Sequence, residues 1–180
     1  MPLTDLLRLA ITVALTGVLI WAAVTDIRSR MIPNLSVVVV LGLYAAWAIV
    51  NKGSGLAPAL GAAVLAFAVT VALYAFKGMG AGDAKLFSAV ALFAGLEHLP
   101  ILVLTTALTG GAMGAISLAS RPTRALVMLT LRGKGDYGRG IPYGVAIAAG
   151  GALTIWIVMS KLMPLPWSSL VRQGLASMSL

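Results

Sequence analysis

Two of the five acidic residues in this chain of 180 stand where carboxylate chemistry is possible. Asp26 ends a long apolar stretch, and Asp83 closes a glycine-rich run within GMGAGDAKL, residues 78–86. Ionisable groups at membrane depth are costly and are usually functional. If the two carboxylates meet, they cannot both ionise easily, so one keeps a proton. The ionised carboxylate could then activate water while its partner polarises a peptide carbonyl, which is peptide hydrolysis without metal or covalent intermediate.

A second interpretation stays open for both residues. Asp83 could act only as a helix N-cap, because a negative charge is favoured at a helix N-terminus. Asp26 could pair with Arg28 or Arg30 at the membrane interface. Spacing alone favours this capping interpretation, since capping is commoner than catalysis. The scarcity of acids and the convergence of these two on one membrane face favour catalysis instead.

The other chemically active side chains exclude several classes of site. Asp5 and Glu97 are expected at the outer rim, and Asp136 lies in the turn-like stretch RGKGDYGRG. With no cysteine, the chain can form neither a disulfide nor a thiolate zinc site. The single histidine, His98, cannot build a histidine metal site alone. We therefore expect no metal and no cofactor.

Glycines surround the second aspartate. Gly78, Gly80 and Gly82 permit positive φ and let another backbone approach closely, because they lack Cβ. The run does not match a phosphate-binding loop. A flexible connector would explain the glycines equally well, whereas a protease would use them to lay substrate backbone beside Asp83.

The elements that carry these residues are expected to be transmembrane helices. The chain is 60% hydrophobic and 10% charged, with a mean hydropathy of +1.01. Its apolar runs do not alternate with polar residues as barrel strands do. We predict an all-α polytopic membrane protein with six spans: Leu6–Thr25, Leu35–Val50, Leu56–Phe76, Ala84–Leu96, Pro100–Ala119 and Ile141–Ser160.

The basic residues predict the orientation of these spans. In the six-span topology nine of the thirteen Lys and Arg residues fall on one side, five of them in the loop 120–140. The richer side should be cytoplasmic, which places both termini outside and both aspartates at the cytoplasmic face. The net charge of +8 then indicates anionic lipid rather than nucleic acid. Residues 1–163 are expected to form one domain, and 164–180 an interfacial tail.

Three stretches resemble one known family. GAGD at residues 80–83 matches the GxGD motif of membrane aspartic proteases, and GMGAGDAKL resembles its type IV prepilin peptidase form. TDIRSRMIPN at residues 25–34 resembles that family's first aspartate segment. GIPYGVA at residues 140–146 is similar to the motif that opens its last spans. The three stretches occur in the family's order and cover nearly the whole chain.

This resemblance implies an aspartyl endopeptidase of the bacterial inner membrane. It would remove the basic leader of prepilins or pseudopilins at the cytoplasmic face, with Asp26 and Asp83 as the catalytic pair. The short chain looks most like the peptidases of tight-adherence (Flp) pili. Larger members carry a cysteine-containing insert and also N-methylate the trimmed pilin. This chain has no cysteine, so methylation is not expected.

Supporting roles and rival functions are also predicted. Gly80 and Gly82 would support the motif, Lys85 could steady a carboxylate or face headgroups, and Pro33 with Asn34 would shape the start of the second span. The alternatives are another GxGD protease, such as a preflagellin-type or presenilin-like enzyme, a small proton-coupled transporter, or a structural subunit of a secretion machine.

Overall fold

Helices make up almost all of the computed structural model, which describes residues 2–29, 31–76, 78–119 and 143–162. Over these residues there is no strand, which confirms the all-α prediction. In chain order the helices are α1 (Leu3–Ser29), α2 (Asn34–Val50), α3 (Leu56–Ala75), α4 (Ala81–Ala119) and α6 (Tyr143–Leu162).

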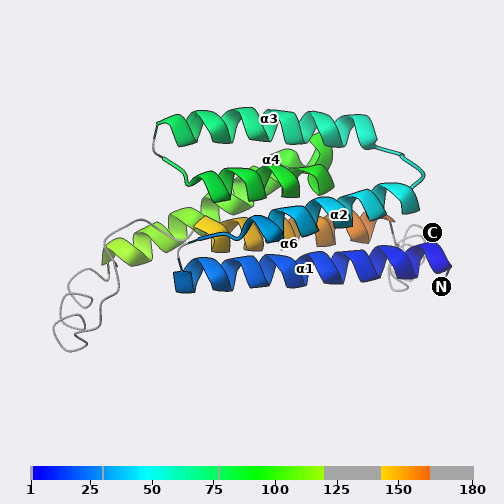
Figure 1. The fold of residues 1–180 in the computed structure, drawn as a ribbon, viewed down its shortest axis with the longest axis horizontal. Coiled ribbons are helices and arrows are strands. Elements are labelled where there is room, and N and C mark those ends of the chain that lie inside the picture. The colour runs from blue at the N-terminus through cyan, green and yellow to red at the C-terminus, as the bar shows by residue number, and fades with distance from the viewer. Residues whose placement is uncertain (1, 30, 77, 120–142, 163–180) are drawn as a thin grey trace, which may run out of the picture.

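The helices run along the long axis of the molecule, so their ends gather in two groups (Figure 1). Where α1 finishes, α2, α4 and α6 all begin; we call this the aspartate end, because Asp26 lies in the last turn of α1 and Asp83 in the first turn of α4. The N-terminus and the end of α2 lie at the other end, called here the opposite end. The fold thus brings together helix ends that are far apart in sequence.

Helix α6 is central because it packs against both α1 and α4. Two adjacent glycines allow the close approach. A Cβ on Gly151 would lie 2.8 Å from Val90 Cγ1 of α4, and one on Gly150 would lie 3.0 Å from Thr105 Oγ1. Helices in lipid gain little from burying apolar surface against each other, so small residues at their contacts matter most. The position of α6 is therefore set by backbone-close contact with α4.

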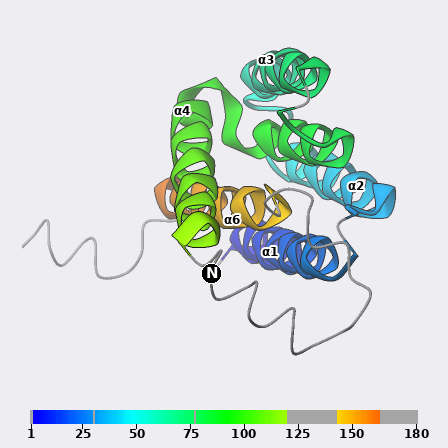
Figure 2. The same ribbon diagram turned by 90° about the vertical axis from the view of Figure 1, so that its left-hand side faces the viewer.

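Helix α4 consists of two helical parts that meet at Gly95. This residue has φ 60° and ψ 177°, which is not helical. The two parts lie at a steep angle to one another in Figure 2. We predicted a break after Leu96 and a new span from Pro100; the break is real but occurs one residue before Leu96, and Pro100 lies inside the second part. The fourth span also begins earlier than predicted, at Ala81.

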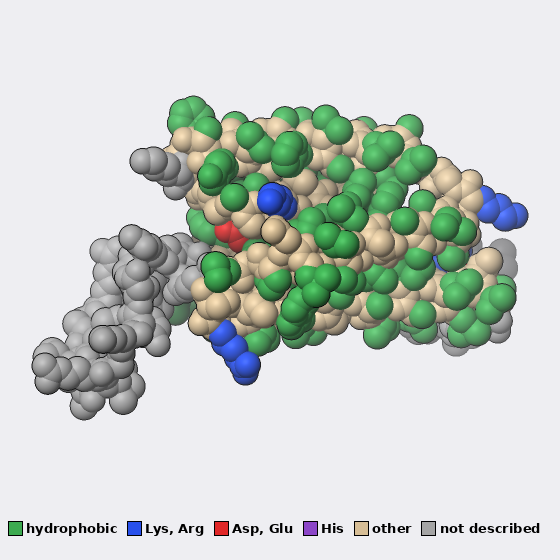
Figure 3. Space-filling view, in the orientation of Figure 1, with side chains coloured by type: hydrophobic (Ala, Val, Ile, Leu, Met, Phe, Trp, Pro, Cys, Tyr) green, Lys and Arg blue, Asp and Glu red, His purple; other side chains and the backbone are tan. Residues whose placement is uncertain are grey.

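Length and composition support a polytopic membrane protein. Four helical segments are long and apolar enough to cross a membrane: Leu3–Ser29, Leu56–Ala75, Ala81–Ile116 and Tyr143–Leu162. The apolar helix Asn34–Val50 is shorter. The prediction of several spans is thus confirmed, whereas the number six is not. Large hydrophobic side chains cover the face seen in Figure 3, and charged atoms lie toward its ends.

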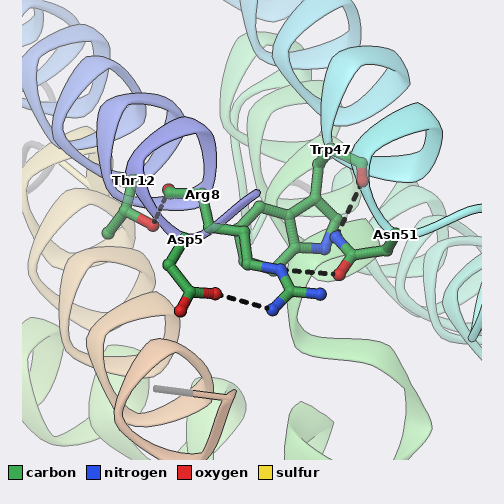
Figure 4. Close-up of polar contacts among 5 residues, drawn as sticks. All are labelled: Asp5, Arg8, Thr12, Trp47 and Asn51. Carbon is green, nitrogen blue, oxygen red and sulfur yellow. Dashed lines mark hydrogen bonds and ion pairs between the residues drawn. The ribbon is translucent and has the colours of Figure 1, made fainter. Parts of the chain in front are cut away.

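Polar contacts fasten the helices at the opposite end (Figure 4). Arg8 donates from Nε to Asn51 Oδ1 at 3.0 Å and from Nη1 to Asp5 Oδ1 at 3.2 Å. Asn51 in turn donates from Nδ2 to the Trp47 carbonyl at 2.8 Å. These contacts join the start of α1 to the end of α2, so Asp5 is a rim residue, as predicted.

The second rim acid also has a cation partner. Lys161 Nζ, at the end of α6, lies 2.7 Å from Glu97 Oε1, just after the break in α4. Both side chains are exposed. His98 beside it is buried, with Nε2 at 3.7 Å from the same carboxylate oxygen. This pair connects the end of α6 to the second part of α4.

Candidate functional site

Asp26 is a buried carboxylate in the last turn of α1. Only 6% of its surface is exposed. Its Oδ2 accepts a hydrogen bond of 2.8 Å from the backbone N–H of Gly144, the second residue of α6. A buried charge is costly unless it is hydrogen-bonded, and this donor comes from a residue 118 positions away. The sequence placed Asp26 just beyond the first span, but α1 continues to Ser29.

Asp83 occupies the first turn of α4 and is only partly exposed. The first helical hydrogen bond runs from Ala84 N to Gly80 O at 3.0 Å, which makes Gly80 the residue that begins the helix. The backbone N–H of Gly80 donates to the Asp83 carboxylate. Asp83 therefore caps from inside the first turn, in the manner of a capping box, rather than as the N-cap itself.

The two carboxylates lie at the same end of the bundle although they belong to helices far apart in sequence. The charge of Asp26 acts on Asp83 through space. Helices α1 and α4 both pack against α6, and their ends meet at the aspartate end. Figure 3 shows acidic atoms on the surface there, with Lys and Arg atoms nearby. Two adjacent carboxylates titrate as a pair and can share one proton.

The glycines of GMGAGDAKL serve close contacts within the chain. None of Gly78, Gly80 and Gly82 has a positive φ. A Cβ on Gly80 would lie 2.8 Å from Asp83 Oδ2, and one on Gly82 would lie 3.2 Å from Ile32 Cβ. Gly80 thus makes room for the carboxylate, and Gly82 lets α4 approach the stretch before α2.

The other predicted supporting residues have separate positions. Pro33 is the N-cap of α2, and its carbonyl accepts from Ser36 N at 3.0 Å and Ser36 Oγ at 2.7 Å. Asn34 is exposed as the first residue of that helix. Both residues thus lie where α2 begins, and their supporting role at the site stays a prediction. Lys85 is exposed, and no ion pair joins it to Asp83.

Gly144 is the residue of this site that the sequence did not single out. It belonged to the GIPYGVA stretch, but no property of a lone glycine predicts a contact with an aspartate on another helix. The start of that stretch, residues 140–142, and the basic loop 120–140 lie outside the described residues, as does the tail 164–180. In the part of the chain that is described, no cluster of three or more His, Cys, Asp or Glu residues could hold a metal ion.

Comparison with known proteins extends these observations. The type IV leader peptidase family matches residues 13–115, a segment that contains both aspartates. A prepilin leader peptidase/N-methyltransferase of Bacillus subtilis is 31% identical over 149 residues, which are 82% of this chain and 55% of that protein. Proteins of the same name from two strains of Burkholderia pseudomallei are 34% identical over 84 residues, 47% of this chain and 23% of theirs.

The chain thus spans between about a quarter and about half of the length of these relatives. No solved structure matches it. The family match nevertheless covers more than half of the chain and includes the two segments in which the aspartates lie. This chain belongs to the type IV leader peptidase family.

Proposed function

We propose that this protein is an aspartic endopeptidase that removes the leader of prepilins or pseudopilins. The observation that carries the proposal is that two carboxylates, Asp26 at the end of α1 and Asp83 at the start of α4, lie at the same end of the bundle. The substrate class comes from the relatives, which are named prepilin leader peptidases. The proposal covers peptide cleavage alone and does not extend the methyl transfer in those names to this chain.

The pair can divide the work of hydrolysis between an ionised and a protonated carboxylate. The ionised group removes a proton from water as the water oxygen bonds to the peptide carbonyl carbon. The protonated group gives its proton to the carbonyl oxygen, which stabilises the developing negative charge. When the C–N bond breaks, the carboxyl that took the water proton gives it to the leaving amine. A hydroxyl of the tetrahedral intermediate gives a proton to the other carboxylate as the new carboxyl group forms, so the pair is singly protonated again. Every proton is accounted for by the two carboxylates and one water.

The site is proposed to face the cytoplasm of a bacterial inner membrane. Counting α2 as a span and the two parts of α4 as separate crossings gives six spans, which puts both termini on the side away from the aspartates. Nine of the thirteen basic residues then fall on the side of the aspartates. Cytoplasmic loops carry such an excess of Lys and Arg. A place among the Flp-type peptidases is part of this proposal, and the basic residues support contact with anionic lipid.

Replacing either aspartate should abolish cleavage. The test is co-expression of the full chain with candidate prepilins, each having a basic leader, a glycine before the cut and an apolar helix after it. The wild-type chain should shorten at least one of them on a gel. In Asp26→Asn and Asp83→Asn the side-chain shape is kept but the charge and its basicity are lost, so the cleavage rate should fall by at least about 100-fold.

The control is an acid outside the site. Asp5→Asn removes a carboxylate of the opposite end that pairs with Arg8. Both side chains are partly exposed, and a pair near the surface contributes about 0 to 1 kcal/mol. Cleavage by this variant should remain close to wild type. All three variants should accumulate in the membrane to similar levels. Full processing by a stable Asp26→Asn or Asp83→Asn chain would refute the proposed function, as would failure of the wild type on every prepilin.

A further inference from the structure

Gly144 stands out because it lies so close to Asp26 that no side chain fits between them. The Cβ that any other residue would carry lies 2.8 Å from Asp26 Oδ2, 2.9 Å from its Cβ and 3.1 Å from its Cγ. Real Cβ atoms essentially never approach other heavy atoms closer than 3.0 Å. Because the Asp26 Cβ is fixed to the backbone of α1, rotation of the carboxylate cannot relieve this crowding. Only glycine fits at this position.

The same glycine supplies a backbone donor at the start of a helix. The first four N–H groups of a helix have no partner within it, and Gly144 is the second residue of α6. Its N–H meets Asp26 Oδ2 at 2.8 Å in a buried setting. The positive end of the helix dipole favours a negative charge there. This hydrogen bond therefore gives one N–H at the start of α6 an acceptor, and it stabilises the charged form of the buried carboxylate.

The start of α6 is itself held against the helix that carries the second aspartate. The position of a Cβ on Gly110, in the second part of α4, lies 3.6 Å from Ala146 Cβ and 3.6 Å from Tyr143 Cε1. These residues flank Gly144 on α6. The N–H that holds Asp26 is thus fixed relative to α4, which connects the position of one carboxylate to the helix of the other.

We propose that Gly144 is a positioning residue that holds Asp26 in register with Asp83 through its backbone N–H. This role rests on the proposed function of the aspartate pair. Gly144 does not touch the substrate; it acts by fixing the place and the charge of Asp26. Residues 143–146 of α6 are then the third element of the site, beside the last turn of α1 and the first turn of α4.

Two changes at this position test separate parts of the proposal in the full chain. Gly144→Ala keeps the N–H and adds the crowding Cβ. Incorporation of glycolic acid at position 144 adds no atom in space and replaces the N–H by an ester oxygen. A hydrogen bond to a charged group is worth roughly 10- to 100-fold in an equilibrium. The ester variant should therefore lose about 10-fold or more in kcat for prepilin cleavage, with KM changed by less than about 2-fold. Gly144→Ala should lose at least as much, because its Cβ displaces Asp26.

The pH profile separates positioning from a loss of folding. Without the N–H, the ionised form of Asp26 is less favoured, so the acid limb of the kcat profile should move to higher pH in the ester variant. Gly150→Ala is the matched control. Gly150 lies in the same helix as Gly144, and a Cβ there would crowd Thr105 and Thr106 of α4 rather than either aspartate. This variant should therefore lower thermal stability without moving the acid limb.

The outcomes distinguish this inference from the proposed function. If Asp26→Asn is inactive while both changes at Gly144 leave kcat and the acid limb as in wild type, the role of Gly144 is wrong and the aspartate pair stands. If the ester variant loses activity only in proportion to its folded amount, as Gly150→Ala would, Gly144 is merely a packing residue. If Asp26→Asn is fully active, the proposed function fails first.

Discussion

At the scale of single residues, the absence of side chains next to the two aspartates is as important as their charges. Gly80 makes room for the carboxylate of Asp83, and Gly144 makes room for that of Asp26. The two cases differ in what lies opposite. At Gly144 the neighbour includes the fixed Cβ of Asp26, whereas at Gly80 it is the movable end of Asp83 alone. Substitution at Gly80 should therefore disturb chemistry more than folding.

Gly80→Ala should lower the rate of prepilin cleavage by at least about 10-fold. It should lower the free energy of unfolding by no more than about 1 kcal/mol. The new Cβ would stand 2.8 Å from Asp83 Oδ2, so the carboxylate must rotate away from its place beside Asp26. Gly78→Ala is the control in the same run. Its Cβ would meet the Leu73 carbonyl oxygen at 3.4 Å, an ordinary contact. Equal activities for the two variants would contradict this account.

The sequence predicts Asp26 and Asp83 as a pair because acids are few in an apolar chain and these two are expected on one face. The structure places both at one end of the bundle, and their catalytic role stays a prediction. The sequence was not sufficient for Gly144, whose role depends on a contact across 118 residues. The glycines near Asp83 do not adopt the positive φ that the sequence permits. Instead, Gly80 lets the Asp83 side chain lie close to its backbone, and Gly82 does the same for Ile32. Whether they also admit substrate stays a prediction.

At the scale of elements, the break in α4 sends the chain back toward the aspartate end (Figure 1). The predicted spans Ala84–Leu96 and Pro100–Ala119 already placed a break in this region. The residue at which it occurs depends on backbone geometry that sequence alone does not specify. Gly95 has φ 60° and ψ 177°, a conformation that is essentially restricted to glycine. Among the described residues nothing lies within 4 Å of its absent Cβ, so crowding by them is not the reason for glycine here.

Gly95→Ala should destabilise the protein by about 1 to 3 kcal/mol, since alanine must adopt a strained backbone or the turn must change. Thermal unfolding in detergent, followed by circular dichroism, measures this. Gly42→Ala is the control, because Gly42 lies within α2 with open space around its absent Cβ. That variant should be as stable as wild type or up to about 1 kcal/mol more stable. A Gly95→Ala protein as stable as Gly42→Ala would show that the break does not require glycine.

At the scale of the whole molecule, the four acids that the structure describes lie at helix ends, two at each end of the bundle. The acids Asp5 and Glu97 pair with cations at the opposite end, and Asp26 and Asp83 both lie at the aspartate end. The sequence predicted this division from a count of charges. The number of spans was harder to predict, because α2 has only 17 residues and α4 is broken at Gly95 into two parts. Short or broken helices of this kind can still cross where the bilayer thins or protein covers them.

The orientation of the molecule can be tested with single cysteines, because the chain has none of its own. Ser54, in the turn between α2 and α3, and Ser29, at the end of α1, are both exposed and lie at different ends. If the excess of basic residues faces the cytoplasm, a membrane-impermeant maleimide should label Ser54→Cys in spheroplasts and Ser29→Cys only after permeabilisation. Permeabilised cells, in which both should react, control for reactivity. Labelling of Ser29→Cys alone in intact spheroplasts would place the aspartates outside the cell. Labelling of both would mean that the two turns face the same side, which is incompatible with α2 as a span.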